Sequence, residues 1–341
     1  MKTIIIVVIA ALTAVVLWFM KSDKRVMNLK FHPNALKGNV LGESEERSLW
    51  VYLPEGYEKS DQRYPVIYYL HGFTDNYNTF KNLEMKKLMD EGIKNGRIQP
   101  CILVVPDSDT KFKGSFYANE WADYIAIDLV NYIDSSFRTI KDKSSRGIAG
   151  HSMGGNGALK LAMLYPTVFG SVHAMSPSVL NWSTEFTLEN PSFSVIDKAK
   201  TQDDIFADFY ASVLTAMGRT YAPDINSKHF QARFPVVFKD GKKEIDSAIL
   251  KQWNSQFPIQ IFERDSSCLN MCSGVLIDCG KDDGYPHIPV TCKELSEKIK
   301  AQGISCMFEM YEGDHASGLG GTEGRIGKNM LDFFNKNLKF K

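Results

Sequence analysis

Short runs of β-branched and aromatic residues alternate with amphipathic helical patterns along most of the chain. The strand-like runs are Leu49–Leu53, Val66–Leu70, Cys101–Pro106, Arg146–Ala149, Ser171–Met175, Val275–Cys279 and Cys306–Tyr311. The helical patterns cover Phe80–Glu91, Trp121–Phe137, Met153–Leu164, Pro289–Ala301 and Gly324–Leu338. This alternation predicts an α/β fold of parallel βαβ units, with a mostly parallel twisted sheet covered by helices on both faces.

One long stretch interrupts that alternation. Between Met175 and Val275 the chain contains five prolines and many aromatic residues, too many for a simple loop. We interpret residues 177–272 as an inserted, partly helical cap whose aromatic side chains mainly form its own core rather than a substrate wall. Residues 21–45 are predicted to be a polar lead-in to the sheet.

The N-terminus has the pattern of a targeting segment. Ile4–Met20 is an apolar or weakly polar run with basic residues on both sides. At about 1.5 Å per residue, it could almost cross a hydrocarbon layer of about 30 Å. The nearest candidate cleavage site, Ala11–Ala14, contains a bulky leucine where a small residue is needed. The sequence therefore favours an uncleaved signal anchor over a cleaved signal peptide for residues 1–25, and an extracytoplasmic body, periplasmic or secreted, for residues 26–341.

Composition excludes several classes of protein. The 341 residues include 40 basic and 40 acidic residues, a formal net charge of zero. Residues 1–25 contribute four basic residues and one acidic residue, so the body is slightly acidic. A body without a basic excess lacks the electrostatic signature of a nucleic-acid-binding protein. With 44% hydrophobic and 23% charged residues, the chain is also not intrinsically disordered.

The six cysteines do not form a recognisable metal-binding pattern. They are Cys101, Cys268, Cys272, Cys279, Cys292 and Cys306. Several lie in or beside strand-like runs, as buried thiols do. Cys268 and Cys272 could close a small disulfide loop if the body lies outside the cytosol. A zinc site that added Cys279 and His287 to this pair matches no tetrahedral ligand spacing, so no metal is expected.

Residues Gly150–Gly154 read Gly-His-Ser-Met-Gly, a G-x-S-x-G motif with Ser152 at its centre. The five-residue pattern alone is common, but here a predicted strand precedes it and a predicted helix begins at it. In that context the two glycines permit a tight turn that exposes the serine hydroxyl at a helix N-terminus. Ser152 is therefore the candidate nucleophile, and a glycine-rich turn without catalytic function is the alternative.

A serine hydroxyl needs a base, and the base needs an orienting carboxylate. In a sheet of this type the acid and the histidine follow the serine along the chain, in loops after later strands. Asp283 follows the strand-like run Val275–Cys279, and His315 follows the run Cys306–Tyr311. The order Ser152, Asp283, His315 therefore predicts a catalytic triad.

Other residues compete for two of these roles. His287 is the main alternative to His315 as the base. Asp282 shares the turn with Asp283 and is the next choice for the acid, whereas Asp278 still lies within the predicted strand. Asp314, next to the predicted base, is interpreted as a solvent-facing loop residue.

Two backbone amides are predicted to form the oxyanion hole. One is the N–H of Met153, directly after the nucleophile, and the other is the N–H of Phe73, in the loop after Val66–Leu70. Gly72 before it would let the backbone approach the reacting atoms closely. Each such donor typically contributes about 3 kcal/mol of transition-state stabilisation.

Five segments together resemble one family of α/β-hydrolases, the "putative esterase" family, which includes esterase D, S-formylglutathione hydrolase and antigen 85. The matching segments, which occur in family order between residues 48 and 338, are Trp50–Tyr57, Tyr64–Gly72, Arg146–Gly155, Asp278–Asp283 and Tyr311–His315. The resemblance implies an α/β-hydrolase fold with Ser152, Asp283 and His315 as the triad. It also implies that Tyr117 and Asn119, which precede the Trp121 helix, border the acyl or alcohol pocket.

The resemblance implies a serine carboxylesterase that acts on small-acyl or carbohydrate esters through an acyl-enzyme, without metal or organic cofactor. Acyl transfer of the antigen 85 type and thioester hydrolysis of the S-formylglutathione type would use the same residues. Only some relatives share a segment like residues 177–272, so the substrate remains open. A membrane-tethered binding module without turnover is a further alternative, although such modules usually have a broken triad.

Overall fold

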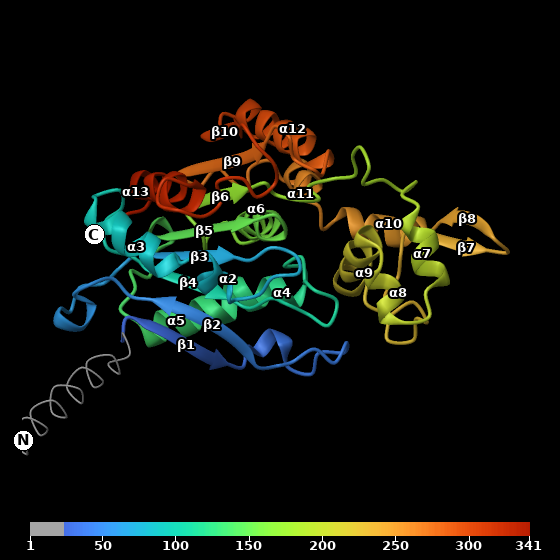
Figure 1. Ribbon diagram of the computed structural model, residues 1–341, viewed down its shortest axis with the longest axis horizontal. Coiled ribbons are helices and arrows are strands. Elements are labelled where there is room, and N and C mark those ends of the chain that lie inside the picture. The colour runs from blue at the N-terminus through green and yellow to red at the C-terminus, as the bar shows by residue number, and fades with distance from the viewer. Residues whose placement is uncertain (1–23) are drawn as a thin grey trace, which may run out of the picture.

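The computed structural model describes residues 24–341 (Figure 1), so the predicted Ile4–Met20 anchor lies outside the described residues. Eight strands form one sheet in the order β1-β2-β4-β3-β5-β6-β9-β10. Their bounds are β1 Val26–Phe31, β2 Arg47–Tyr52, β3 Val66–Leu70, β4 Ile102–Pro106, β5 Arg146–His151, β6 Ser171–Met175, β9 Gly274–Gly280 and β10 Cys306–Tyr311.

The strands from β4 to β10 in this order run parallel to one another, and only β1 and β2 are antiparallel to their neighbours. This confirms the predicted α/β fold with a mostly parallel sheet. Every residue of the central strands β3, β4 and β6 is buried, because helices cover both faces. That burial explains why these strands read as continuous apolar runs rather than as alternating patterns.

Helices pack on both faces of the sheet (Figure 1). One face is covered by α2 (Thr79–Asn82), α3 (Met85–Lys94), η5 (Arg325–Met330) and α13 (Leu331–Asn337). The other face is covered by α4 (Glu120–Asp123), η3 (Tyr124–Leu129), α5 (Val130–Ser136), α6 (Met153–Leu164) and α12 (His287–Ala301). Short single turns are η1 (Asn34–Leu36), η2 (Tyr57–Lys59) and η4 (Lys143–Ser145).

The structure departs from the predicted elements in two places. The predicted polar lead-in contains the edge strand β1, which pairs with β2 from Val26 opposite Tyr52 to Phe31 opposite Arg47. Its half-exposed residues gave a weak hydrophobic signal. The predicted helix Phe80–Glu91 is two helices, because Glu84 between them has a φ of +49° and therefore breaks the right-handed backbone.

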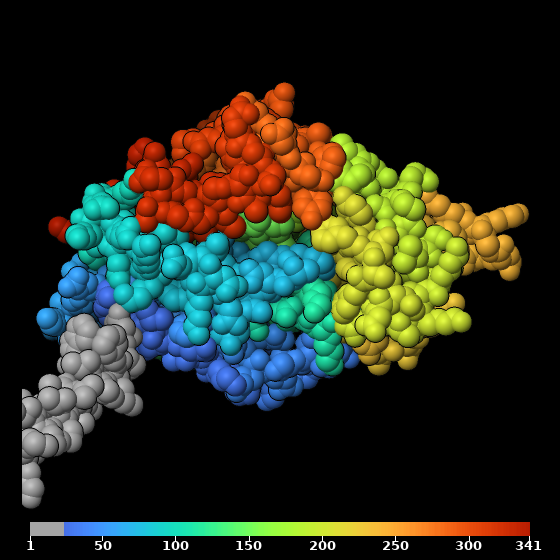
Figure 2. Space-filling model, viewed as in Figure 1, coloured from blue at the N-terminus to red at the C-terminus, as the bar shows by residue number. Residues whose placement is uncertain are grey.

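Residues 177–272, predicted as a cap, contain five helices and a two-stranded hairpin. These elements are α7 (Ser192–Lys198), α8 (Gln202–Phe206), α9 (Phe209–Tyr221), β7 (Val236–Lys239), β8 (Lys242–Ile245), α10 (Ser247–Asn254) and α11 (Pro258–Arg264). All of them except α11 lie together at one end of the sheet (Figure 1), where they pack against the rest of the molecule (Figure 2). Because α11 packs on α6, the segment returns to the core before β9 begins.

Aromatic rings form the interior of this segment. Trp253 is fully buried, and its ring lies within 6.0 Å of that of Trp182 and 5.7 Å of that of Tyr221. The predicted role of most of these aromatics as the segment's own core agrees with this packing. Within residues 24–341, no helix has the length and apolar character needed to cross a membrane.

Candidate active site

Ser152 stands at a sharp turn between β5 and α6. Its φ of +57° and ψ of −117° lie outside the regions that residues with a Cβ prefer, so the turn is strained. The glycines on either side are required by close packing rather than by their own dihedral angles. A Cβ on Gly154 would lie 2.0 Å from the carbonyl oxygen of Leu70, and one on Gly150 would lie 2.4 Å from the backbone of Gly154. The motif therefore presents the Ser152 side chain at the carboxyl edge of the sheet.

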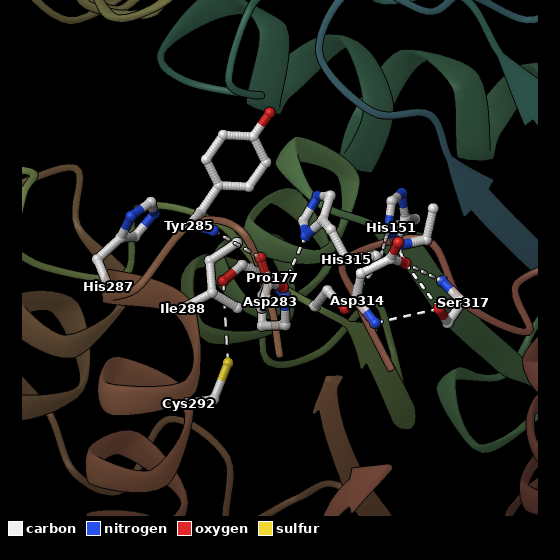
Figure 3. Close-up of polar contacts among 12 residues, drawn as sticks. His151, Pro177, Asp283, Tyr285, His287, Ile288, Cys292, Asp314, His315 and Ser317 are labelled. Atoms are coloured by element: carbon white, nitrogen blue, oxygen red, sulfur yellow. Dashed lines mark hydrogen bonds and ion pairs between the residues drawn. The ribbon is translucent and has the colours of Figure 1, made fainter. Parts of the chain in front are cut away.

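Asp283 and His315 meet at the same edge (Figure 3). The Nδ1 atom of His315 lies 2.8 Å from Oδ2 of Asp283, whose side chain is fully buried. The other carboxylate oxygen of Asp283 accepts a hydrogen bond of 3.0 Å from the backbone N–H of Tyr285. A buried carboxylate held in this way orients the imidazole, as the acid of a serine-hydrolase triad does.

The competing acids have other surroundings. Asp282 is exposed, and its backbone N–H donates to the carbonyl oxygen of Gly313. Asp314 is a loop residue whose carboxylate accepts hydrogen bonds from the hydroxyl and the backbone N–H of Ser317. Asp278 is buried but faces His173 and not His315. Of the four aspartates, only Asp283 contacts His315.

The competing histidine, His287, is bound to a glutamate instead. Its Nδ1 atom lies 2.5 Å from Oε1 of Glu185, in the segment predicted as a cap. Figure 3 shows the Tyr285 ring between those of His287 and His315. The ring of Tyr285 meets that of His315 edge to face, with centroids 5.0 Å apart. His287 therefore lies beside the site but apart from the Asp283–His315 pair.

The backbone carbonyl of His315 is held by several donors. Nε2 of His151 lies 2.9 Å from this oxygen, Oγ of Ser176 donates over 3.3 Å, and Nη1 of Arg325 donates over 3.4 Å. Burial, together with the neighbouring His315 ring and the charge of Arg325, lowers the pKa of His151 to about 3, so its ring stays neutral. A neutral His151, with its ring centroid 4.6 Å from that of His315, does not oppose a positive charge on the base.

A buried ionic network anchors Arg325. Its guanidinium donates to Oδ1 of Asp278, and Nε2 of His173 lies 2.7 Å from Oδ2 of the same carboxylate. Burial by itself would raise the pKa of Asp278, but the hydrogen bonds and charges of His173 and Arg325 outweigh it and hold that pKa below its ordinary value. The backbone of His315 is thus linked, through Arg325, to the buried side chains of Asp278 in β9 and His173 in β6.

The predicted oxyanion donors lie next to Ser152. A Cβ on Gly72 would be 3.6 Å from the Cβ of Ser152, which shows how closely this loop approaches the nucleophile. The backbone N–H groups of Phe73 and Met153 donate to no acceptor within residues 24–341. Two unpaired amides beside a serine hydroxyl can stabilise a negatively charged oxygen.

Two hollows meet at Ser152. The narrow hollow has a volume of about 30 Å³ and extends under the predicted cap. Its apolar lining consists of Phe73, Phe116, Val179, Phe186, Phe209 and Val213. The wide hollow has a volume of about 380 Å³ and also reaches His315. Its polar lining includes Thr74, Asp75, Thr79 and Asn82.

The structure brings Ser152 and His315 to one hollow without a hydrogen bond between them. The hydroxyl of Ser152 has no hydrogen-bond partner within the described part of the chain, whereas the Asp283–His315 contact is formed. Catalytic hydrogen bonds in unliganded hydrolases often tighten only when substrate binds. The arrangement can deprotonate a hydroxyl and stabilise an oxyanion, which are the two requirements of acyl transfer.

Tyr117 and Asn119, predicted to border the substrate pocket, line neither hollow. Tyr117 is fully buried, and its hydroxyl donates to the carbonyl oxygen of His71 over 2.9 Å. The amide nitrogen of Asn119 donates over 2.6 Å to the carbonyl oxygen of Thr220 in α9. Tyr117 therefore supports the loop that carries the predicted oxyanion donor Phe73, and Asn119 links the core to α9, while a direct role in substrate binding stays a prediction.

The cysteines take no part in this site. All six are free thiols in the structure, including Cys268 and Cys272. Burial raises the pKa of Cys272 to about 11, so its thiol stays protonated at neutral pH. Within residues 24–341 no three histidine, cysteine or acidic side chains are grouped as metal ligands would be.

Sequence reasoning missed several residues around the site. Arg325 and His173 were not singled out, although an arginine at the start of a helix after the His315 loop was visible. Glu185 gave no signal at all, because it meets His287 only through the packing of segments 102 residues apart. Tyr285, two residues after the predicted acid, could have been noticed as a neighbour of the base.

A comparison with known families matches residues 43–248 to the family described as "Putative esterase". An endo-1,4-beta-xylanase/feruloyl esterase from Xylanibacter ruminicola is 36% identical over 130 residues, which are 35% of this chain and 18% of that protein. An esterase from Mycobacterium tuberculosis is 30% identical over 167 residues, which are 46% of this chain and 33% of that protein. The matched regions thus span a third or less of these relatives' own length.

Among solved structures, a ferulic acid esterase superposes with a TM-score of 0.61 at 20% identity. The alignment covers 92% of this chain and 98% of the other. At this level of identity the comparison establishes the fold, and the fold agrees with the predicted sheet and helical layers.

Proposed function

The chain belongs to the putative esterase family, and from this membership we propose that it is a serine carboxylesterase with Ser152 as its nucleophile. The observation that carries the proposal is the hydrogen bond between His315 and the buried Asp283, beside a hydroxyl on a strained strand–helix turn. This arrangement has the parts of a serine-hydrolase triad in the chain order expected for this fold.

In the proposed reaction, Ser152 attacks the ester carbonyl while His315 accepts the hydroxyl proton. Asp283 holds the imidazolium that results, and the amides of Phe73 and Met153 donate to the oxyanion. His315 then protonates the departing alcohol, which leaves an ester on Ser152. Water, deprotonated by His315, attacks this acyl-enzyme and releases the acid and the free serine.

The volumes of the two hollows support placing the acyl group of the substrate in the narrow hollow and its alcohol in the wide one. An apolar cavity of about 150 Å³ binds benzene, and a single water needs about 10–15 Å³. The narrow hollow of about 30 Å³ therefore suits an acyl chain with roughly two or three non-hydrogen atoms beyond the carbonyl. The wide polar hollow suits a larger alcohol such as a carbohydrate, so we propose short-acyl esters of sugars or similar alcohols as substrates.

A second candidate is an aromatic acyl ester. It is favoured by the names of relatives, since one matching protein carries the name feruloyl esterase. A feruloyl ring exceeds the narrow hollow as it stands, so this substrate would require the half-exposed side chain of Phe209 to move aside. Thioester hydrolysis and acyl transfer to an alcohol use the same residues and differ in the leaving group or the final nucleophile.

The proposal is tested with the chain and its Ser152→Ala variant on p-nitrophenyl acetate, p-nitrophenyl butyrate and methyl ferulate. We expect hydrolysis of the two short esters, with the rate lowered by at least three orders of magnitude in the variant. A fluorophosphonate probe should label Ser152 and nothing else. Equal rates for both proteins, or a label on another residue, would disprove the nucleophile assignment.

A further inference from the structure

One residue that lines the narrow hollow next to Ser152 has an unpaired polar atom. The ring of His287 is 3% exposed and leaves Nε2 without a hydrogen-bond partner within residues 24–341. Among the described residues that line the hollow, no other buried polar side-chain atom lacks a partner. A buried polar atom without a partner typically costs about 1–3 kcal/mol, so a substrate group that pairs with Nε2 would gain binding energy from that hydrogen bond.

Glu185 binds the other nitrogen of this ring and so fixes the orientation of the ring. Its carboxylate lies 2.5 Å from Nδ1 of His287. It also accepts hydrogen bonds from the backbone N–H of His287 over 3.0 Å and from the hydroxyl of Tyr210 over 3.1 Å. Burial alone would raise the pKa of Glu185, but the hydrogen bonds and charge around it, mainly from His287, lower that pKa to about 2. The carboxylate is therefore ionised and accepts only, so Nδ1 must carry its proton.

With Nδ1 bound to Glu185, Nε2 is the ring nitrogen that is left to pair with a ligand. A group that fills the hollow and pairs with this atom must be able to form a hydrogen bond. An unsubstituted acyl chain cannot do so, but a hydroxyl substituent can both donate and accept. The ring is also held in place by Phe186, 5.7 Å away between centroids, so Nε2 is positioned before substrate binds.

We propose that His287, oriented by Glu185, is a specificity-determining residue that selects short acyl groups bearing a hydroxyl. This inference rests on the proposed esterase function and adds to it the chemistry of the acyl half. Glu185 comes from the segment predicted as a cap and His287 from the first turn of α12, directly after the loop that carries Asp283, so the selection depends on how that segment packs against the core.

The test compares ester pairs in which a hydroxyl replaces a methyl group of nearly the same size. The pairs are methyl 3-hydroxypropanoate with methyl butanoate, and methyl lactate with methyl isobutyrate, followed by acid release in a pH-stat. Because the two members of a pair differ in intrinsic reactivity, the informative quantity is how the ratio of their kcat/KM values changes between protein variants. Each acyl group has three non-hydrogen atoms beyond the carbonyl and matches the volume of the hollow.

Three variants separate the role of Nε2 from a general effect of losing a histidine. His287→Asn keeps a donor where Nδ1 meets Glu185 but removes Nε2, and should lower the hydroxyl-to-methyl ratio about tenfold for at least one pair. His287→Gln returns a hydrogen-bonding amide near the position of Nε2 and should restore part of that ratio. His229→Asn changes a histidine of residues 177–272 that lines neither hollow, and should leave the ratio as in the unmodified protein.

The outcomes distinguish the inference from the proposed function. If the unmodified protein hydrolyses none of the four esters nor p-nitrophenyl acetate, the esterase proposal itself fails. If it hydrolyses them but His287→Asn leaves both ratios unchanged, a water satisfies Nε2 and the inference is wrong. A preference for the methyl member that depends on His287, or a ratio lost in His229→Asn but not in His287→Asn, would also overturn it.

Discussion

The backbone of Ser152 stores strain that glycine would release, so Ser152→Gly should yield a more stable and inactive protein. A φ of +57° with a ψ of −117° costs a residue with a Cβ about 1–3 kcal/mol. Glycine adopts these angles freely but loses about 0.5–1 kcal/mol more conformational entropy on folding. The hydroxyl of Ser152 has no hydrogen bond within residues 24–341 to offset this difference, so the net gain in the free energy of unfolding should be about 0.5–2 kcal/mol.

Ser152→Ala is the matched control, because it removes the same hydroxyl and keeps the Cβ and the strain. Its stability should stay within about 0.5 kcal/mol of the unmodified protein. Urea denaturation followed by far-UV circular dichroism measures the free energies, and thermal scans should place Ser152→Gly about 1–4 °C above Ser152→Ala. A glycine variant that is no more stable than the alanine variant would refute the claim that the nucleophile turn is strained.

Further predictions concern the acid, a buried lysine and the ionic network. Asp283→Asn should lower kcat on p-nitrophenyl butyrate about 10⁴-fold. The kcat of Asp282→Asn should stay within about twofold of that of the unmodified protein, because Asp282 is exposed. The reverse pattern would assign the acid to Asp282. Burial lowers the pKa of Lys160 to about 7, so between pH 7 and 10.5 the unfolded chain binds a proton that the folded chain does not. The free energy of unfolding should therefore rise with pH relative to that of Lys160→Met, by about 3 kcal/mol from pH 7 to pH 10 in urea titrations, and parallel pH profiles would contradict this. Arg325→Met leaves the buried carboxylate of Asp278 without its arginine and should lower the free energy of unfolding by about 3 kcal/mol in the same assay, with a smaller loss in Arg325→Lys; no loss in either variant would show that the network does not stabilise the fold.

The amino-acid sequence by itself determined the features that are local in the chain. Continuous apolar runs predicted strands that are buried on both faces, and the five residues around Ser152 predicted a strand–turn–helix, because the pattern of side chains controls the nearby backbone. The edge strand Val26–Phe31 was missed because half-exposed residues give a weak pattern and its pairing partner lies about twenty residues away. The order of serine, aspartate and histidine also followed from the chain, since the loops after parallel strands meet at one edge.

Only the tertiary structure decided which of several equivalent side chains meet. Asp282 and Asp283 share one turn, and the sequence favoured Asp283 without excluding Asp282, but the fold buries Asp283 against His315 and exposes Asp282 to solvent. Nothing in the sequence near Glu185 indicates that it orients His287, because that contact depends on how residues 177–272 return to the core. Local patterns specify backbone geometry over a few residues, whereas a contact between distant residues depends on the packing of every element between them. For that reason the sequence indicated the chemistry, and the packing of distant segments determined the shape and polarity of the hollows beside Ser152.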